Sequence, residues 1–593
     1  MKNIFNKSAL IGSVLALCLA GSSCNDELDL APIDYPGAGS FWTNSTEFVG
    51  NIYSMSSMFR SNYTMNITFW AGELRAGTLT VDLINGSGAL NEDYIQNLYD
   101  ESHTQFSNFG NYYGFIANLN ELIFECNRAD EAILSDNIKN CLLGIAHGWR
   151  AFSYFQLYRM YGGVPLRQEP DVILGITNPE ELYMPRATAQ ETLDFIKNDI
   201  QLSLGFFNNT NYTINSKKQY YWSKAATEML AGEVYLWSGK VETDDHKANA
   251  ADVTTAKTYF NNVVNNYGYK LVSNYFDVWS TPRNSEIIYS VCYSSLDDQV
   301  QSTGVSNQFL WSKSAGAGTV SWSIQDATGL GFVKDGSASR FGYYNGAQYS
   351  CWNLLTPSPN RYMYKNAMYF QIDDQDQRKE MYFPQWAVTD EEEGKNITYI
   401  ENFDPTTHTM MGSFMNKYRP TIVSEWSQSY IWNNDIAIYR LPLAYMYLAE
   451  IANYEGNNAD VVKYINLVRQ RAYGSNWDVA KYGYTAGSFR ENENAILREK
   501  DKEFLMEGQR WWDLRRLTAV KGGSQTDHFV FQPESCAGYG LNTAANPWMV
   551  DASGQAVQTS VPVLNTSEVH KLLWPIDATL LGSDPEIKQN PGY

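Results

Sequence analysis

The residues that could catalyse a reaction are spread thinly along this chain. Its six histidines, at positions 103, 147, 246, 408, 528 and 570, form neither an HExxH motif nor a pair four residues apart, which argues against a zinc hydrolase. The chain also lacks a GxSxG nucleophile motif and a GxxxxGKS/T phosphate-binding loop. Two carboxylates could still meet in space to cleave a glycosidic bond, because sequence does not give their separation. A surface glycoside hydrolase therefore stays open as the less favoured alternative.

One acidic run could bind a metal ion. Asp373, Asp374 and Asp376 place carboxylates close together around Gln375, and calcium prefers oxygen ligands of this kind. The run lacks the turn glycine and the distant glutamate of an EF-hand loop, so a solvated acidic turn is the favoured interpretation. We therefore predict no cofactor, and a structural calcium ion has no further support in the sequence.

Aromatic side chains are the binding chemistry that this chain offers in quantity. They make up 14% of its residues, including 41 tyrosines and 17 tryptophans. Such rings fill cores, but they also stack on flat apolar faces of ligands while a hydroxyl or indole N–H bonds at the edge. Between residues 304 and 434 no helical periodicity persists, and the segment is rich in Gly, Ser, Asn and aromatic residues. Long loops in a compact protein are usually functional, so we predict the ligand-binding region here.

Composition and charge narrow the class of partner. The 593 residues are 44% hydrophobic, which suffices for a sizeable core and for several domains. Asp plus Glu number 65 against 44 Lys plus Arg, a net charge of -21. An acidic surface repels phosphates, so nucleic acid is not a predicted partner.

The N-terminus predicts export and lipidation. Lys2 and Lys7 precede an apolar run over residues 9–20, too short to span a bilayer, and small residues stand directly before Cys24. This arrangement resembles a bacterial lipoprotein signal over residues 1–23, in which Cys24 is acylated and becomes the first mature residue. Cys18 is a poorer cleavage site because Leu17 precedes it. Residues 24–40 would then be a lipidated linker. Their acidic start resembles a bacterial surface-export signal, which favours the outer face of the outer membrane.

The remaining cysteines do not form a metal or disulfide pattern. Cys126, Cys141, Cys292, Cys351 and Cys536 are odd in number and contain no CxxC pair. A bridge between Cys126 and Cys141 stays open, but buried thiols are favoured.

Apolar spacing predicts a mainly helical scaffold interrupted by one strand and two loop regions. Residues 62–90 read as a loop, and residues 285–293 alternate like a strand. Small and aromatic positions in two helix pairs resemble those of tetratricopeptide repeats. The predicted helices cover residues 41–59, with Asn44 or Ser45 as N-cap, 109–127, 137–161, 188–203, with Thr188 and Glu191 as a capping box, 222–238, 248–266, 441–454 and 460–472.

Residues 494–517, the signature segment, predict one amphipathic helix of about six turns. Leu497, Phe504, Gly508 and Trp511 share one face, and Gly508 there predicts a close approach by the backbone of another element. The opposite face is predicted to carry weak ion pairs along the helix, formed by Glu503, Glu507, Arg510, Asp513 and Arg516.

Within this segment, residues 503–516 (EFLMEGQRWWDLRR) closely resemble the signature helix of the SusD/RagB family of surface nutrient-binding lipoproteins. Residues 150–166, residues 185–188 and the C-terminal QNPGY are similar to further blocks of that family. The resemblance implies a mainly α fold of tetratricopeptide-like helix pairs, a superhelical scaffold with a large irregular loop-rich ligand-binding region. It also implies a non-enzymatic role: an outer-membrane lipoprotein that captures oligosaccharides and delivers them to a SusC-like TonB-dependent transporter. Capture of peptides or another nutrient is the alternative.

The candidate ligand contacts follow from loop position, because the family has no invariant ligand motif that maps onto this chain. Sugar rings need aromatic platforms and polar groups beside them. The predicted domains are a helical scaffold over residues 41–303, which includes a loop at 62–100, then a ligand-binding region at 304–434, and then a C-terminal helical part at 435–593. The candidates are Trp70, Glu73 and Arg75 in the first loop and Trp311, Trp322, Tyr344 and Trp352 in the second region.

Overall fold

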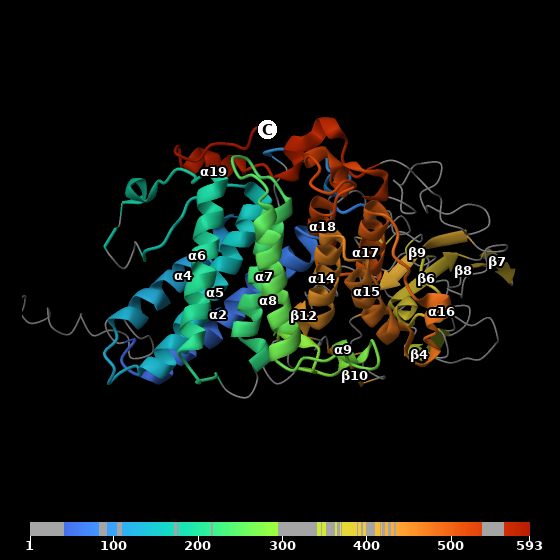
Figure 1. Cartoon of the computed structure of the whole chain (residues 1–593), viewed down its shortest axis with the longest axis horizontal. Coiled ribbons are helices and arrows are strands. Elements are labelled where there is room, and N and C mark those ends of the chain that lie inside the picture. The colour runs from blue at the N-terminus through green and yellow to red at the C-terminus, as the bar shows by residue number, and fades with distance from the viewer. Residues whose placement is uncertain are drawn as a thin grey trace, which may run out of the picture.

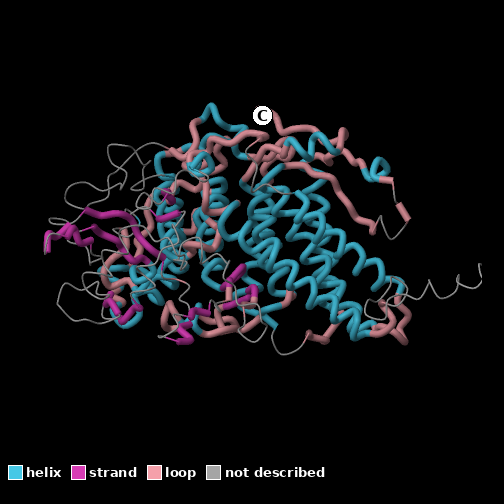
Figure 2. Tube along the Cα trace, turned by 180° about the vertical axis from the view of Figure 1, so that it is seen from behind, coloured by secondary structure: helices cyan, strands magenta, loops and turns pink. Residues whose placement is uncertain are grey.

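The computed structural model shows paired helices at one end and in the middle of the molecule, and several of the strands at the other end (Figures 1 and 2). It describes residues 41–81, 92–102, 109–170, 175–176, 178–214, 218–293, 435–535 and 562–593, with shorter pieces between 341 and 431. The signal, the linker and Cys24 lie outside the described residues. Among those described, no helix is both long enough and apolar enough to cross a membrane.

The helices account for most of the described chain. The long ones are α2 (Ser45–Met65), α4 (Phe109–Arg128), α5 (Asp136–Tyr161), α6 (Ala189–Asn208), α7 (Lys224–Lys240), α8 (Ala250–Asn266), α14 (Leu441–Glu455), α15 (Asn458–Tyr473) and α17 (Phe489–Glu503). Shorter α-helices are α3 (Glu92–Ile95), α9 (Asp277–Ser280), α16 (Val479–Tyr482), α18 (Arg510–Arg516) and α19 (Ala578–Ser583). Single 3-10 turns are η2 (Pro179–Leu182), η3 (Lys218–Tyr220), η5 (Gln377–Met381), η6 (Gly474–Asn476), η7 (Gln525–Asp527), η8 (Phe529–Phe531), η9 (Pro533–Ser535) and η10 (Thr566–Leu572).

Neighbouring helices pack in pairs, α5 on α6, α7 on α8 and α14 on α15, and α8 packs on α14 to join two of these pairs. Close packing needs small residues at the contacts. A Cβ at Gly232 of α7 would lie 2.5 Å from the ring of Phe260 on α8, so only glycine fits this crossing. The mainly helical, paired architecture predicted from the sequence is therefore confirmed.

The predicted ends of several helices are confirmed by their caps. Thr188 and Glu191 form the capping box that starts α6. Gly162 ends α5 with φ of 76°, a value that favours glycine. Gly456 closes α14 in the left-handed region, and the Asn457 side chain then caps α15. Asn44 caps α2 by accepting hydrogen bonds from the backbone N–H groups of Thr46 and Glu47.

The first loop region is more helical than predicted. Helix α2 runs to Met65 and continues as a π-helical turn, η1 (Asn66–Trp70), before the chain turns toward strand β1 (Leu79–Val81). The first glycine of the predicted loop is Gly72, after the helical turns have ended. Buried Phe59, Tyr63, Ile67 and Phe69 explain why the helical conformation persists, since each packs into the main hydrophobic core.

Strands occupy much of what is described in the region predicted to be irregular. One sheet has the order β1-β5-β9-β6, and it joins Leu79–Val81 of the first loop to strands of the aromatic-rich region, residues 304–434. The predicted strand at residues 285–293 is confirmed as β2 (Ile287–Val291), which pairs antiparallel with β12 (Ile436–Arg440). The others are β3 (Phe341–Tyr344), β4 (Ala347–Ser350), β5 (Tyr362–Tyr364), β6 (Tyr382–Ala387), β7 (Thr389–Glu392), β8 (Lys395–Thr398), β9 (Thr409–Met415), β10 (Thr421–Ser424) and β11 (Ser429–Ile431).

The signature segment is not one helix, and that prediction is wrong. Helix α17 ends at Glu503, a turn follows, and α18 begins at Arg510. Met506 and Gly508 have φ of 62° and 70°, which no α-helix contains. The turn keeps the spacing of apolar residues, so periodicity alone could not detect the break.

Gly508 does allow the close backbone approach that the sequence predicted. A Cβ at this position would lie 2.0 Å from the carbonyl oxygen of Ile67, and one at Gly72 would lie 2.0 Å from the carbonyl oxygen of Gly508. The backbone N–H of Trp511 donates to the Gly72 carbonyl at 2.9 Å. Two segments more than 400 residues apart in sequence are thus joined through their backbones, and the Gly508 N–H also donates to the Glu73 carboxylate at 3.2 Å.

Cys126 and Cys141, for which a disulfide was left open, are separate buried thiols. Burial raises the pKa of both, so neither is a reactive thiolate near neutral pH.

We predict that Gly508→Ala destabilises the protein by about 2–4 kcal/mol, because it adds a Cβ at a positive φ and against a backbone oxygen. Chemical denaturation followed by circular dichroism measures the change. Gly114→Ala is the matched control: this helical glycine of α4 has open space where its Cβ would stand, so its stability should be unchanged or higher by up to about 1 kcal/mol. Equal stability of Gly508→Ala and the wild type would contradict the close approach.

Candidate functional site

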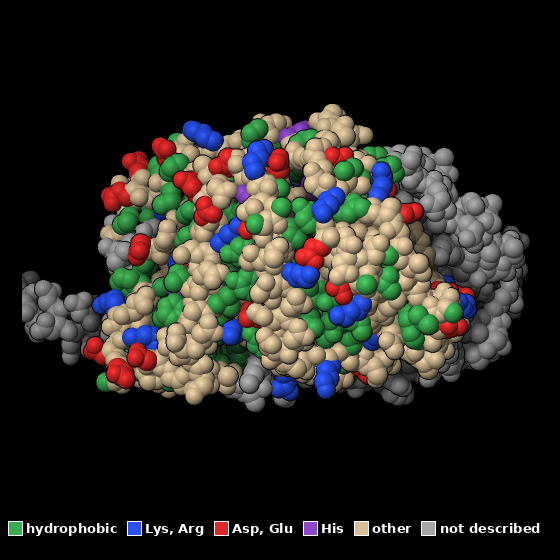
Figure 3. Space-filling view, viewed as in Figure 1, with side chains coloured by type: hydrophobic (Ala, Val, Ile, Leu, Met, Phe, Trp, Pro, Cys, Tyr) green, Lys and Arg blue, Asp and Glu red, His purple; other side chains and the backbone are tan. Residues whose placement is uncertain are grey.

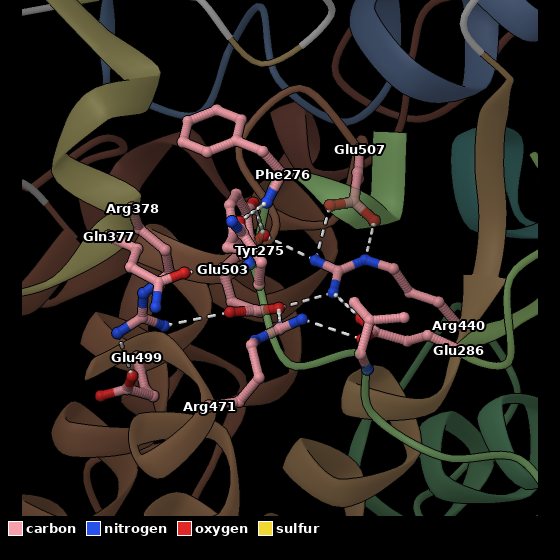
Figure 4. Close-up of polar contacts among 12 residues, drawn as sticks. Tyr275, Phe276, Glu286, Gln377, Arg378, Arg440, Arg471, Glu499, Glu503 and Glu507 are labelled. Atoms are coloured by element: carbon pink, nitrogen blue, oxygen red, sulfur yellow. Dashed lines mark hydrogen bonds and ion pairs between the residues drawn. The ribbon is translucent and has the colours of Figure 1, made fainter. Parts of the chain in front are cut away.

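A buried charge cluster lies where the aromatic-rich region meets the helical scaffold (Figure 4). It joins carboxylates to guanidinium and ammonium groups from seven parts of the chain. Its members are Glu286 beside β2, Arg378 of η5, Lys417 after β9, Arg440 of β12, Arg471 of α15, Glu499 and Glu503 of α17, and Glu507 in the turn before α18.

Glu503 is at the centre of the charge cluster. Its carboxylate pairs with Arg440 at 2.5 Å and with Arg378 at 3.1 Å, and it also contacts Arg471. Arg440 in turn reaches Glu507 at 2.7 Å and Glu286 at 3.0 Å. Such short contacts among several charges are what allows carboxylates and guanidinium groups to be buried together, because each charge needs partners once water is removed.

Two cations of the cluster come from the aromatic-rich region. Arg378 pairs with Glu499 at 2.7 Å and with its neighbour Asp376 at 2.7 Å. The Lys417 ammonium donates to the Leu505 carbonyl at 2.6 Å and pairs with Glu507. Both cations are fully buried. They therefore attach the aromatic-rich region to α17 and to the turn that follows it.

The pKa shifts follow from this geometry. Burial alone would raise the pKa of the Glu503 carboxyl, but the surrounding guanidinium groups, Arg471 first, lower it to about 2. Burial also disfavours the charged form of Arg440, and the carboxylates of Glu507 and Glu503 reverse this effect and raise its pKa. Burial lowers the pKa of Lys417 to about 8, although the Glu507 carboxylate opposes this shift. Except for Lys417, these pKa shifts favour the ionised state near neutral pH.

The sequence predicted weak surface pairs along one helix for these same glutamates, and that prediction is wrong. Glu503 and Glu507 are buried, and their partners stand far away in sequence. Of the pairs predicted at helical spacing, Arg516–Asp513 at 2.7 Å is formed, and it too is buried. Arg510 instead pairs with Asp501.

Of the candidate ligand contacts in the first loop, Glu73 and Arg75 contact the signature segment. Trp70 ends η1 and is half-buried, with its ring 4.5 Å from that of Phe69. Glu73 is 1% exposed and accepts the Gly508 N–H at 3.2 Å. Burial raises the pKa of Glu73 to about 8.

Arg75 is also 1% exposed, and aromatic rings surround it. Its guanidinium carbon lies 3.8 Å from the ring centre of Trp511, 4.6 Å from that of Tyr99 and 5.3 Å from that of Trp574. It also donates to Asn97 at 2.9 Å. Glu73 and Arg75 thus pack inside the protein, and their burial corrects the prediction that they contact a ligand.

The second set of candidates is described only in part. Tyr344 ends strand β3 and pairs with Ala347 of β4 in a tight hairpin. Trp311, Trp322 and Trp352 lie outside the described residues. Their role as ligand contacts therefore stays a prediction.

The acidic run at residues 373–376 forms a turn in which two carboxylates are exposed and one is buried. Asp373 and Asp374 are exposed, as predicted, whereas Asp376 is buried against Arg378. Asp374 pairs with Lys379. Within the described part of the chain, no three acidic, histidine or cysteine side chains come together as a metal site would require.

Comparison with known proteins decides the family. The profile of the SusD family matches residues 285–593. A SusD superfamily protein of Bacteroides fragilis has 36% sequence identity and a TM-score of 0.73, over 93% of this chain and all of that one. The chain belongs to the SusD family. Members of this family are non-catalytic binding proteins, and this confirms the prediction of a non-enzymatic role.

Further matches cover the N-terminal part and the whole length of this SusD-family chain. Residues 54–236 match a family described as starch-binding and associating with the outer membrane. The NanU protein of B. fragilis is 25% identical, with a TM-score of 0.64 over 95% of this chain and all of that one. A SusD-like protein of Formosa agariphila is 23% identical over 84% of this chain and 88% of its own length. The match to the second family indicates association with the outer membrane.

The cations that attach the aromatic-rich region escaped the sequence analysis. Arg378 and Lys417 have no local pattern, because their partners in the signature segment stand more than 80 positions away. One signal in the sequence could have predicted them: the signature segment contains many charged residues, glutamates among them, next to large apolar residues. Strongly apolar neighbours such as Trp511 and Trp512 indicate that these charges are buried and need distant partners.

We predict that Arg378→Met destabilises the protein by roughly 3–5 kcal/mol, because it leaves the buried Glu499 and Asp376 carboxylates without this partner. Limited proteolysis with mapping of the fragments should show cuts within residues 304–434 before cuts in the paired helices.

Lys379→Met is the matched control for this experiment. Lys379 is the next residue, but its partner Asp374 has a side chain that is 83% exposed, so little stability should be lost. Equal protease resistance of the Arg378→Met and Lys379→Met variants would show that the charge cluster does not hold the region in place.

Proposed function

We propose that this protein is a cell-surface glycan-binding lipoprotein that captures oligosaccharides and delivers them to a SusC-like TonB-dependent transporter in the outer membrane. The observation that carries the proposal is the attachment of the aromatic-rich region to the helical scaffold through buried Arg378 and Lys417. A binding site needs side chains held in fixed positions, and a rigid support supplies this. The starch-binding description of the family that matches residues 54–236 supports a carbohydrate as the ligand.

The chemistry of the region suits a sugar. A pyranose ring presents flat C–H faces to aromatic rings and a rim of hydroxyls to amides and carboxylates. Trp311, Trp322, Tyr344 and Trp352 are the ring-bearing contacts that we propose from sequence. Trp70, half-buried at the end of η1, is a further candidate from the described residues.

An acylated Cys24 would anchor the protein to the membrane, and the acidic residues that follow it favour the outer face. The acylated cysteine would follow the signal at residues 1–23, and the linker at 24–40 would separate the lipid from the first helix at Ser45. A lipid tail with a short linker holds the protein near a transporter in the same membrane and raises its local concentration there. Delivery of a bound sugar then needs no chemical step.

The test is affinity electrophoresis in gels that contain amylopectin, xylan, laminarin or a β-glucan, with a peptide digest of casein as competitor. We predict that at least one polysaccharide retards the protein and that it is recovered unchanged by chromatography. Trp311→Ala and Trp322→Ala should each weaken retardation several-fold, while Trp311→Phe and Trp322→Phe, which keep a ring, should weaken it less.

The circular dichroism signal of the helices controls for folding in these variants. A collapse of that signal in Trp311→Ala would assign the ring to the core. Retardation by no polysaccharide, together with binding to casein peptides, would replace the proposal with peptide capture.

We predict that Cys24→Ala abolishes incorporation of a radioactive fatty acid, because the thiol that carries the lipid is lost. Labelling in cells followed by immunoprecipitation measures this. Cys18→Ala is the matched control and should retain the label. Label retained by Cys24→Ala and lost by Cys18→Ala would move the processing site to Cys18.

A further inference from the structure

We propose that Trp477 and Tyr482 form a second carbohydrate-binding platform, beside the aromatic-rich region and outside the ligand contacts predicted above. Trp477 precedes the single-turn helix α16 (Val479–Tyr482), and Tyr482 is the last residue of that helix. The inference rests on the proposed function, since it names a further contact for the same class of ligand. We call these residues and their neighbours the α16 platform: Tyr473, Trp477, Val479, Lys481 and Tyr482.

The rings of the α16 platform form a layered arrangement. The ring of Tyr482 stacks on that of Tyr473, with centres 4.0 Å apart and planes at 24°. Trp477 lies 6.1 Å from Tyr473 at 55°. Tyr473 is buried, while Trp477 and Tyr482 are half-buried. A buried ring thus supports two rings that are partly open to solvent, as a stacking surface requires.

The backbone of the α16 platform is held in place from several sides. The Trp477 N–H donates to the Gly474 carbonyl at 3.2 Å, and the Asp478 carboxylate caps α16 through the Ala480 N–H at 2.9 Å. Arg469 donates to the Tyr482 carbonyl at 3.0 Å. Rings fixed in this way lose little entropy when a ligand binds, which favours binding.

Gly474 shows where the platform sits in the protein. It has φ of 53°, and a Cβ there would lie 2.4 Å from the side-chain nitrogen of Gln377. Gln377 begins η5, which leads directly into β6 of the aromatic-rich region. The α16 platform therefore adjoins the region that we propose as the main ligand site, and one long glycan chain could contact both.

Polar groups surround the rings. Asn476, Lys481, Asp373 and Asp374 are exposed. The Lys481 ammonium lies 4.7 Å from the centre of the Tyr482 ring. Hydrogen bonding to Tyr482 raises the pKa of Lys481, and the charge of Asp373 adds to this rise. An amide, an ammonium and carboxylates beside aromatic rings are the groups that bond sugar hydroxyls.

The apolar surface here is not explained by folding. Val479 is 64% exposed, the largest exposure among the big apolar side chains of the described residues. In Figure 3, green apolar side chains lie over the position that α16 has in Figure 1, with red and blue side chains at their edge. Val479 and the two half-buried rings together offer apolar surface to a ligand.

The small size of the patch favours a sugar over a protein partner. A stable protein interface uses roughly 20–30 residues on each side. Two half-buried rings and one valine instead match one or two sugar units, each of which needs a flat ring face and a few hydrogen bonds.

The test compares Trp477→Ala and Tyr482→Ala with the wild-type full chain in affinity gels of the polysaccharide that retards the wild type most. We expect each variant to bind roughly three- to tenfold more weakly, and Trp477→Phe to bind within about twofold of the wild type, because it keeps a ring. Tyr183→Ala is the matched control: Tyr183 is also surface-exposed, at 37%, but stands after η2 in the N-terminal part. It should bind as the wild type does.

A second measurement separates ligand contact from folding. The full chain is labelled with 5-fluorotryptophan, and the fluorine resonance of Trp477 is assigned by its absence in Trp477→Phe. A shift of this resonance on adding the polysaccharide's oligosaccharides, with unchanged circular dichroism in Trp477→Ala, supports the platform.

The outcomes distinguish this inference from the proposed function. Unchanged retardation of Trp477→Ala and Tyr482→Ala, while Trp322→Ala loses it, overturns the α16 platform and leaves glycan capture standing. Retardation of the wild type by no polysaccharide overturns both. A Trp477 resonance that moves only with casein peptides would assign the platform to a peptide.

Discussion

The structure depends on one constraint: a carboxylate buried among cations must be fully paired, or it cannot stay charged. Glu503 meets this requirement with three arginines from three different elements. Because the desolvation cost of each charge is several kcal/mol, α15, β12 and η5 must all be in place for the charge cluster to form. The charge cluster therefore forms only when the strands, the paired helices and the aromatic-rich region have all come together.

A second buried network, which includes Arg516 of the signature segment, repeats this principle. Lys240 of α7 pairs with Glu450 of α14 at 2.7 Å and with Glu493 of α17 at 3.1 Å. Arg516 of α18 pairs with the same Glu450 at 2.9 Å. The signature segment therefore contributes charges to both networks, one toward the paired helices and one toward the strands. This dual role gives a physical reason why so many charged residues stand beside Trp511 and Trp512 in a segment that is almost entirely buried.

The sequence predicted the helices well and the connections poorly, and each outcome has a physical cause. Helices such as α5 and α6 are set by local apolar spacing and local caps, which sequence contains. The break before Arg510 has two causes. Met506 adopts a positive φ, a backbone conformation that residues other than glycine rarely adopt, and Gly508 contacts Glu73, which is 435 positions away. Arg75 looked like a loop residue, yet it lies between rings that are distant in sequence. Long-range burial of this kind has no local signature, so candidate ligand contacts chosen by loop position included side chains of the core.

These contacts also give a reason why the aromatic-rich region is attached through ions and not through apolar packing alone. Apolar surfaces fit together in many registers, whereas Arg378 must meet Glu499 and Asp376 at hydrogen-bond distance and with fixed geometry. The position of η5 is thereby set relative to α15 and α17. The loop that carries Trp477 begins at the end of α15 and contacts Gln377, the first residue of η5. Helix η5 therefore fixes the position of the rings beside α16 relative to the strands of the aromatic-rich region. A ligand that spans both would meet surfaces whose spacing is set before it binds.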